Sequence, residues 1–112
     1  MYNEQEHDVI RGNFLTLHEN SGETGETFLK HFGMTYTDGT FDAKTKHLMA
    51  MCGAIAAGCY GCIIGQARRA LDLGATKNEM IEVCMVAVSL GGTMAGSNAT
   101  GVIQLMKDRG ML

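Results

Sequence analysis

Two long stretches without a charged side chain constrain this sequence most, at residues 48–67 and 83–106. Each is long enough to cross a membrane. However, Gly58 interrupts the first stretch, and Gly91-Gly92 interrupts the second, which also contains several polar side chains. The basic clusters and aromatic belts that flank membrane spans are missing as well. We therefore expect both stretches to form the buried core of a soluble protein, with no membrane partner.

The composition favours closely packed helices over a sheet. The 112 residues include 15 glycines, no proline and only 6% aromatic residues, so the core must be built from Ala, Met, Leu, Ile and Val. This length predicts a single domain over residues 1–112. The formal net charge is −3, whereas nucleic-acid-binding proteins usually carry excess positive charge, so we expect no nucleic-acid partner.

Helical periodicity and glycine stops together predict an all-α fold of about six helices. Asp42 is a suitable N-cap, and the segment from Thr76 to Glu79 reads as a capping box. Gly74 stands where a helix commonly ends in the left-handed conformation. The helices are expected at about residues 4–18, 23–36, 44–57, from the cysteine pair at 59 and 62 to residue 73, 77–90 and 93–107.

A helix that is apolar on all its faces must be covered on all sides. A domain this small buries only about two-thirds of its surface, so other copies of the chain are the simplest source of the missing cover. We therefore expect a homo-oligomer. Two faces of small residues would let helices approach closely: Ala50, Ala54 and Gly58, and Ala87, Gly91 and Ala95.

The segment Cys59-Tyr60-Gly61-Cys62 is the one motif that carries clear chemistry. Two cysteines at this spacing, at the start of a helix, can form a disulfide, and the helix dipole favours the reactive thiolate. The alternatives are half of a zinc site, which needs two more ligands, and two inert buried thiols. Cys52 and Cys84 lie among apolar residues and are expected to be small buried hydrophobes.

The cysteines also indicate a compartment. The first eight residues carry acids and no apolar core, which is unlike a secretory signal. Four cysteines in such a chain indicate a reducing environment. We therefore expect a cytoplasmic protein.

His47 and Gln66 are the candidates for handling protons beside the cysteines. His47 lies twelve residues before Cys59, about 18 Å along a straight helix, which is too far for contact. If the chain reverses at Gly58, the next helix runs back antiparallel and brings Gln66 to the level of His47. His47 could then act as a base or proton relay. The alternative is a surface histidine beside lysines.

The remaining basic side chains are expected at the surface. His7, His18 and His31 stand in polar contexts and are interpreted as solvated. Arg68 and Arg69 are expected to form a solvated face or contacts between subunits, or to raise the electrostatic potential near the thiols.

Three segments in this order resemble the carboxymuconolactone decarboxylase family, in its alkylhydroperoxidase-D-like branch. They are residues 41–48, residues 56–62, and residues 70–76 with 79–82. The similarity extends from about residue 39 to residue 96. It implies a helical fold built on an antiparallel hairpin and assembled as trimers or hexamers.

The resemblance also implies a function. In the redox branch the two cysteines form a working dithiol that needs no cofactor or metal. By this resemblance, Cys62 would attack the peroxide or disulfide substrate, and Cys59 would resolve the product. A separate thiol reductant would then restore the dithiol. The branch carries Glu twelve residues before its first cysteine and His four residues after its second, whereas this chain has His47 and Gln66. Gln66 can orient a water but cannot serve as a base.

Two other functions remain open. One is a lyase acting on a small lactone, as the family name suggests, although no cluster of Arg and His in the sequence matches such a site. The other is a non-enzymatic oligomeric binding protein in which the dithiol is structural.

Overall fold

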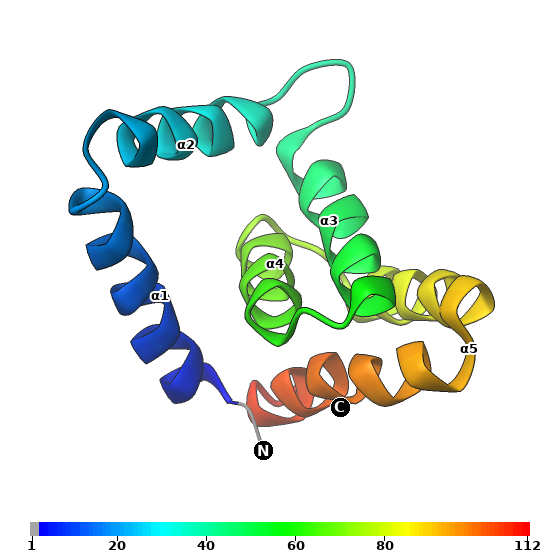
Figure 1. Ribbon diagram of the computed structural model, residues 1–112. Helices are drawn as coiled ribbons and strands as arrows, with labels where there is room; N and C mark the ends of the chain where they lie inside the picture. The colour runs from blue at the N-terminus through cyan, green and yellow to red at the C-terminus, as the bar shows by residue number, and fades with distance from the viewer. Residues whose placement is uncertain (1–2) are drawn as a thin grey trace.

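The structure of this chain is a computed structural model that describes residues 3–112, and every regular element in this range is a helix (Figure 1). The all-α fold class is therefore confirmed, and the helices begin and end within two residues of their expected positions, except for the boundary expected between residues 90 and 93. The helices are α1 (Glu4–Glu19), α2 (Gly22–Thr35), α3 (Ala43–Ala57), α4 (Tyr60–Asp72) and α5 (Lys77–Asp108).

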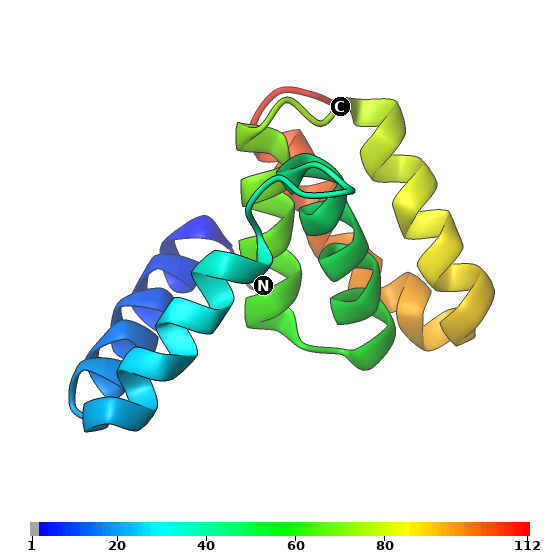
Figure 2. The same ribbon diagram turned by 90° about the horizontal axis from the view of Figure 1, so that it is seen from above.

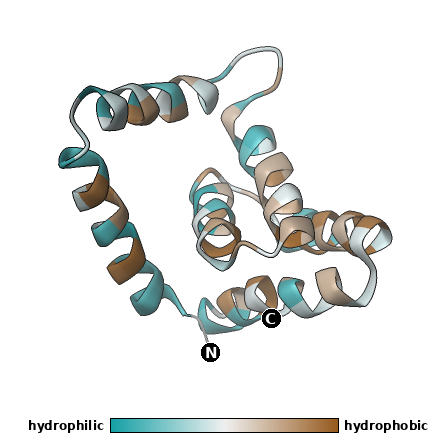
Figure 3. Cartoon of the chain, viewed as in Figure 1, coloured by the Kyte–Doolittle hydropathy of each residue, from teal (hydrophilic) through white to brown (hydrophobic). Residues whose placement is uncertain are grey.

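Helices α3, α4 and α5 pack together around the core, whereas α1 and α2 form a hairpin to one side of them (Figures 1 and 2). Apolar residues occupy much of α3 and α5 (Figure 3). On α4, the apolar residues that are buried belong to the same core. The largest fully buried side chains are Met51, Ile55, Ile63, Met80, Val102 and Met106. The hairpin reaches this unit mainly where α1 lies against α4.

The helix starts read from the sequence are confirmed. The Asp42 carboxylate accepts a hydrogen bond of 2.8 Å from the Thr45 amide at the start of α3. Thr76 and Glu79 form the reciprocal capping box of α5, with bonds of 3.1 and 2.9 Å. Both devices satisfy amide groups that the first turn of a helix leaves unpaired.

Helix α5 bends sharply at Gly92, where the backbone is not helical (φ 68°, ψ −150°) (Figure 1). This is the position where the sequence predicted one helix to end and another to begin. The six expected helices thus correspond to five elements because α5 continues across the kink.

Among the helices described, α5 is long and apolar enough to cross a membrane by length and hydropathy. The kink at Gly92 divides it into two shorter pieces, and a straight span needs about 20 residues. Only 22% of the most apolar 18-residue segment of α5 is buried within the single chain. Its exposed apolar side chains include Met85, Val86, Leu90 and Met94.

The small residues expected to allow close helix packing lie inside the chain. Ala87 and Ala95 are completely buried, and Ala54 is 8% exposed. A methyl group added at Gly91 would lie 3.8 Å from the Cα atom of Ala56. Close approach therefore occurs between α3 and α5 of one chain.

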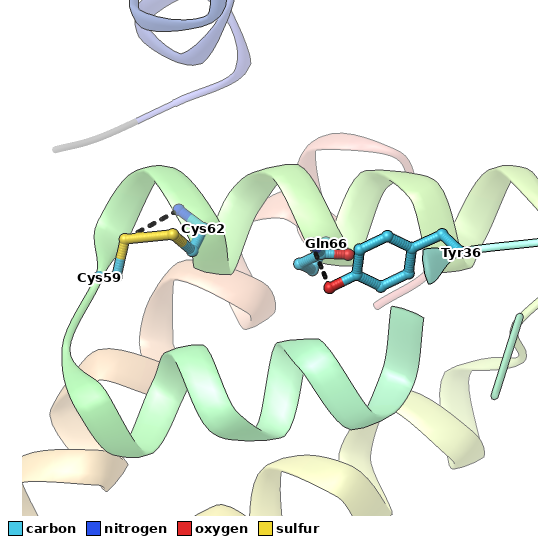
Figure 4. The surroundings of a disulfide bond; sticks show 4 residues. All are labelled: Tyr36, Cys59, Cys62 and Gln66. Atoms are coloured by element: carbon cyan, nitrogen blue, oxygen red, sulfur yellow. Dashed lines mark hydrogen bonds between the residues drawn. A yellow bond between two sulfur atoms is a disulfide. The ribbon is translucent and has the colours of Figure 1, made fainter. Parts of the chain in front are cut away.

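The turn between α3 and α4 reverses the chain and positions the cysteines. Gly58 is left-handed (φ 80°) and ends α3, a conformation that costs glycine little. From α5, the buried Asn98 side chain donates a hydrogen bond of 3.0 Å to the carbonyl of Ile55, in the last turn of α3. Helix α4 then runs back antiparallel to α3, as the expected reversal at Gly58 requires (Figure 4).

Candidate functional site

Cys59 and Cys62 form a disulfide at the first turn of α4, with their Cα atoms 5.2 Å apart (Figure 4). Cys59 is the N-cap residue, and its sulfur accepts a hydrogen bond of 3.4 Å from the Cys62 amide. Both residues are exposed. The amide groups and the dipole of this helix end favour negative charge, so a sulfur released by reduction is stabilised here as a thiolate.

The structure bears on both alternatives for this pair. Within residues 3–112, no group of three or more His, Cys, Asp or Glu side chains is arranged to hold a metal ion, and a zinc site needs four ligands or three with an open position. The inert-thiol interpretation requires burial, whereas both cysteines are exposed. The exposure of both sulfur-bearing residues and the positive end of the α4 dipole are therefore consistent with thiol chemistry at this pair.

The other two cysteines belong to the packed interior. Cys84 is 5% exposed, and Cys52 is partly buried against the same core. Burial, with a smaller contribution from Cys52, raises the pKa of the Cys84 thiol to about 11. Cys84 is therefore a protonated, unreactive thiol at neutral pH, as its expected packing role implies.

His47 and Gln66 meet as the antiparallel hairpin predicted. The Nδ1 atom of His47 lies 2.6 Å from the Oε1 atom of Gln66, and the residues are 6% and 7% exposed. Because Oε1 can only accept, Nδ1 carries the hydrogen, which leaves Nε2 of a neutral imidazole to accept a proton. The interpretation of His47 as a surface histidine is wrong.

Tyr36 completes this arrangement and was not identified from the sequence. Its ring stacks on the His47 imidazole with centroids 4.4 Å apart and planes 6° from parallel. Its hydroxyl accepts a hydrogen bond of 3.4 Å from the Gln66 Nε2 atom (Figure 4). Tyr36 stands at the end of the helix expected at residues 23–36, and nothing local in the sequence indicated its contact with α3 and α4.

A cavity of about 360 Å³ lies between the α1–α2 hairpin and the face of α4 that carries the cysteines. Cys59, Cys62 and Gln66 all line it. The rest of its wall is mainly apolar and includes Ile10, Phe14, Leu15, Leu29 and Phe32. His47 is not one of the lining residues, but its hydrogen-bond partner Gln66 is.

The solvated interpretation of His7 is wrong. His7 is 6% exposed, and its Nδ1 atom accepts a hydrogen bond of 2.8 Å from Arg68. Burial, followed by the Arg68 guanidinium, lowers the pKa of His7. Arg68 also forms ion pairs with Glu4 and Asp8 at 3.1 and 2.7 Å. His7 and Arg68 thus attach α1 to α4, whereas the expected exposure of His31 is confirmed.

Arg69 likewise does not belong to a simple solvated face. Its guanidinium carbon lies 5.0 Å from the centre of the Phe32 ring, at the wall of the cavity. The sequence showed no cluster of Arg and His, but the fold brings His7, Arg11 and Arg69 to this one cavity. His7 and Arg11 lie one turn apart on α1, whereas Arg69 lies on α4, and only tertiary structure joins the two helices.

Comparison with known proteins agrees with this architecture. The apo crystal structure of a carboxymuconolactone decarboxylase family protein from Legionella pneumophila is similar, with a TM-score of 0.84, 27% identity and 91% of each chain covered. A crystal structure of a Thermotoga maritima protein has a TM-score of 0.84 at 23% identity, covering 93% of this chain and 92% of that one.

A second Thermotoga maritima structure, of a family member for which a role in the antioxidative response has been suggested, has a TM-score of 0.79. It is 22% identical and covers 96% of this chain and 97% of that one. At this identity, the Thermotoga structures show the shared fold alone.

In sequence, the chain is 28% identical over 83 residues to uncharacterized protein 4 in the cox locus of Paracoccus denitrificans, covering 74% of this chain and 75% of that protein. The family model of the carboxymuconolactone decarboxylase family matches residues 22–105. This range includes the cysteine pair, His47 and Gln66. The chain therefore belongs to the carboxymuconolactone decarboxylase family.

Proposed function

We propose that this chain is a thiol–disulfide oxidoreductase of the alkylhydroperoxidase-D-like branch, which uses Cys59 and Cys62 to reduce a peroxide or a disulfide. The observation that carries the proposal is the exposed cysteine pair at the first turn of α4, in the wall of a mainly apolar cavity. A role in the antioxidative response has been suggested for a Thermotoga maritima protein of the same fold, and this role is compatible with the proposal.

The proposed cycle starts from the reduced dithiol. The Cys62 thiolate attacks the terminal oxygen of a hydroperoxide, the O–O bond breaks, and the alkoxide takes a proton and leaves as an alcohol. Cys62 is thereby oxidised to a sulfenic acid. The Cys59 thiolate then attacks the Cys62 sulfur, which forms the S–S bond and releases hydroxide, protonated to water. A dithiol reductant reopens the bond by exchange and leaves as a disulfide.

Two buried side chains have separate roles in proton transfer: His47 exchanges the proton, and Gln66 orients a water. Because Gln66 lines the cavity and bonds His47, its amide can orient a water between the reacting oxygen and the imidazole. His47 would accept or supply the proton through that water. The amide itself carries no net proton.

The setting of this chemistry is also part of the proposal. We expect a cytoplasmic homo-oligomer, a trimer or a hexamer, without a nucleic-acid or membrane partner. The exposed side chains of Met85, Val86, Leu90 and Met94 on α5 support association, because a second copy would remove them from water. Light scattering tests the assembly, and a mass near that of one 12.0 kDa chain would contradict it.

The central experiment is mass spectrometry of the reduced protein after limiting cumene hydroperoxide and then after dithiothreitol. We expect a Cys59–Cys62 disulfide that forms and reverses, with Cys84 still a thiol as the internal reference. A Cys59→Ser variant should accumulate a Cys62 sulfenic acid that dimedone traps, whereas Cys62→Ser should not react. Cys52→Ser serves as the matched control and should behave as the wild type.

The other outcomes identify the rival functions. Trapping at Cys59 instead of Cys62 would reverse the two roles. Thiols that stay unmodified would exclude the peroxide cycle and leave the binding protein with a structural dithiol. Lactone turnover retained by a Cys59→Ser/Cys62→Ser variant would favour the lyase.

A further inference from the structure

The cavity beside the cysteines contains two cations that are not neutralised. Arg11 and Arg69 line it from α1 and α4, and neither forms an ion pair with a carboxylate among residues 3–112. Arg68, the neighbour of Arg69 in sequence, is paired with two acidic side chains. The charge of the cavity wall is therefore available to a ligand.

Arg69 is held where an unpaired charge is costly. It is partly buried, and its guanidinium lies over the Phe32 ring at 5.0 Å. Burial and the nearby Arg11 guanidinium both lower its pKa. A charge removed from water without a counter-ion is unfavourable. The attraction of a bound anion would offset the desolvation cost of the Arg69 guanidinium and the repulsion between the two arginines.

The remainder of the wall determines what kind of anion fits. Side chains such as Phe14, Leu15 and Leu29 give the cavity a mainly apolar surface, and its volume of about 360 Å³ is in the range of small-molecule sites. A guanidinium binds a carboxylate through two parallel hydrogen bonds. The geometry points to an amphipathic carboxylate, with its charged group at Arg69 and Arg11 and its apolar chain along α4 toward Cys62.

The spacing along α4 is consistent with this orientation. Cys62 and Arg69 are seven residues apart, which places them on one face of the helix, about 10 Å apart along its axis. A ligand anchored at Arg69 therefore presents its other end to the cysteine pair. On the proposed function, on which this assignment of the reacting group rests, the substrate class is an organic hydroperoxide that carries a carboxylate distant from its peroxide group.

Calorimetric titration of octanoate, with 1-octanol as the neutral probe, tests the site without requiring turnover. The oxidised wild type should bind octanoate more tightly than octanol. Arg69→Gln should weaken octanoate binding about tenfold or more, the scale of a hydrogen bond to a charged group, and Arg69→Lys should restore part of the loss. Arg11→Gln should weaken binding about two- to fivefold, because Arg11 is exposed and its ion pair is screened by water. Octanol binding should change little in all variants.

Lys107→Gln is the matched control, because it removes one positive charge from an exposed position in the last turn of α5, outside the cavity. It should bind octanoate as the wild type does. Arg11 is exposed, so its variant keeps the test valid even if Arg69→Gln does not fold. Absent octanoate binding, equal binding of octanoate and octanol, or equal losses in Arg11→Gln and Lys107→Gln would overturn the proposal.

The two proposals fail separately. Octanoate binding needs no turnover, so a wild-type protein that binds octanoate but does not form the disulfide with cumene hydroperoxide would lose only the proposed redox function. A protein that forms the disulfide with cumene hydroperoxide but does not bind octanoate would lose only the inferred ligand class.

Discussion

The imidazole of His47 donates a hydrogen bond of 2.6 Å from Nδ1 to the Gln66 side chain, and both residues are buried. The bond joins α3 to α4 one helical turn from Cys62. In the redox branch that this sequence resembles, a carboxylate occupies the position of His47 and an imidazole occupies the position of Gln66. The present pair has one ionisable side chain, the imidazole, because the Gln66 amide does not ionise, whereas the branch has two.

The double variant His47→Glu/Gln66→His should accelerate the reaction with peroxide. It supplies a carboxylate that can take up a proton and an imidazole at the wall of the cavity, where Gln66 now lies. General acid–base catalysis contributes about 10²–10⁴-fold to suitable reactions, so we expect a gain of at least about tenfold. Stopped-flow measurement of disulfide formation with cumene hydroperoxide gives the rate.

The equilibrium with dithiothreitol is the control for this variant, because it depends on the sulfur pair and should move little. His47→Glu alone places a carboxylate in a buried position beside an amide and should destabilise the fold. A folded double variant with the wild-type rate would show that proton transfer does not limit the reaction.

His7 should make the stability of the protein depend on pH. Its ordinary pKa is about 6.5, and burial and the Arg68 guanidinium lower this value in the folded state. Below about pH 6.5 the unfolded chain therefore binds a proton more readily than the folded one. The stability contributed by neutral His7 is complete above pH 6.5 and is lost as pH falls through the lower, folded-state pKa.

The free energy of unfolding measured in urea from pH 7.5 to pH 5 gives this slope. A His7→Gln variant should show a smaller slope over that range, whereas His31→Gln, at an exposed position of α2, should keep the wild-type slope. Equal slopes in all three proteins would contradict the role of His7.

The features predicted well from the sequence are those that neighbouring residues decide. Caps such as Asp42, the left-handed Gly74 and the break at Gly91-Gly92 depend on a few adjacent positions, and all are found. The contact between His47 and Gln66 could also be predicted, because a single reversal at Gly58 fixes the register of two adjacent helices.

The contacts made by the α1–α2 hairpin could not be predicted in this way. His7 has a polar local context but lies against Arg68, and Arg69 faces Phe32 of another helix. Helical periodicity gives the faces of one helix, and it does not give the angle at which a hairpin meets the core. The cavity and its arginines depend on that angle.

Gly58 should tolerate alanine poorly. Its left-handed backbone costs a residue with a Cβ atom about 1–2 kcal/mol, and the added carbon would lie 3.4 Å from Nδ2 of Asn98, which bonds the Ile55 carbonyl. We expect Gly58→Ala to lower the free energy of unfolding by about that amount, as measured by urea denaturation.

Gly53→Ala provides a control of opposite sign. Gly53 lies in α3 and is exposed, and a methyl group added there would meet no atom within 4 Å beyond its own helix backbone and chain neighbours. Alanine is favoured over glycine within a helix by about 1 kcal/mol, so this variant should be more stable than the wild type. A loss of stability in both variants, of similar size, would contradict the assignment of strain to Gly58.

The α1–α2 hairpin is fastened to the core at the two ends of its chain. Glu4 and His7 hold the start of α1 through Arg68 and Arg109, and Tyr36 holds the end of α2 on His47. The turn between the two helices projects away from the core (Figure 2). The cavity therefore lies between α4, which belongs to the packed core, and a hairpin that is attached to this core mainly near its two ends. Segments with few buried contacts open at a lower free energy than a packed core, so the hairpin is the wall that we expect to open locally while the core stays folded.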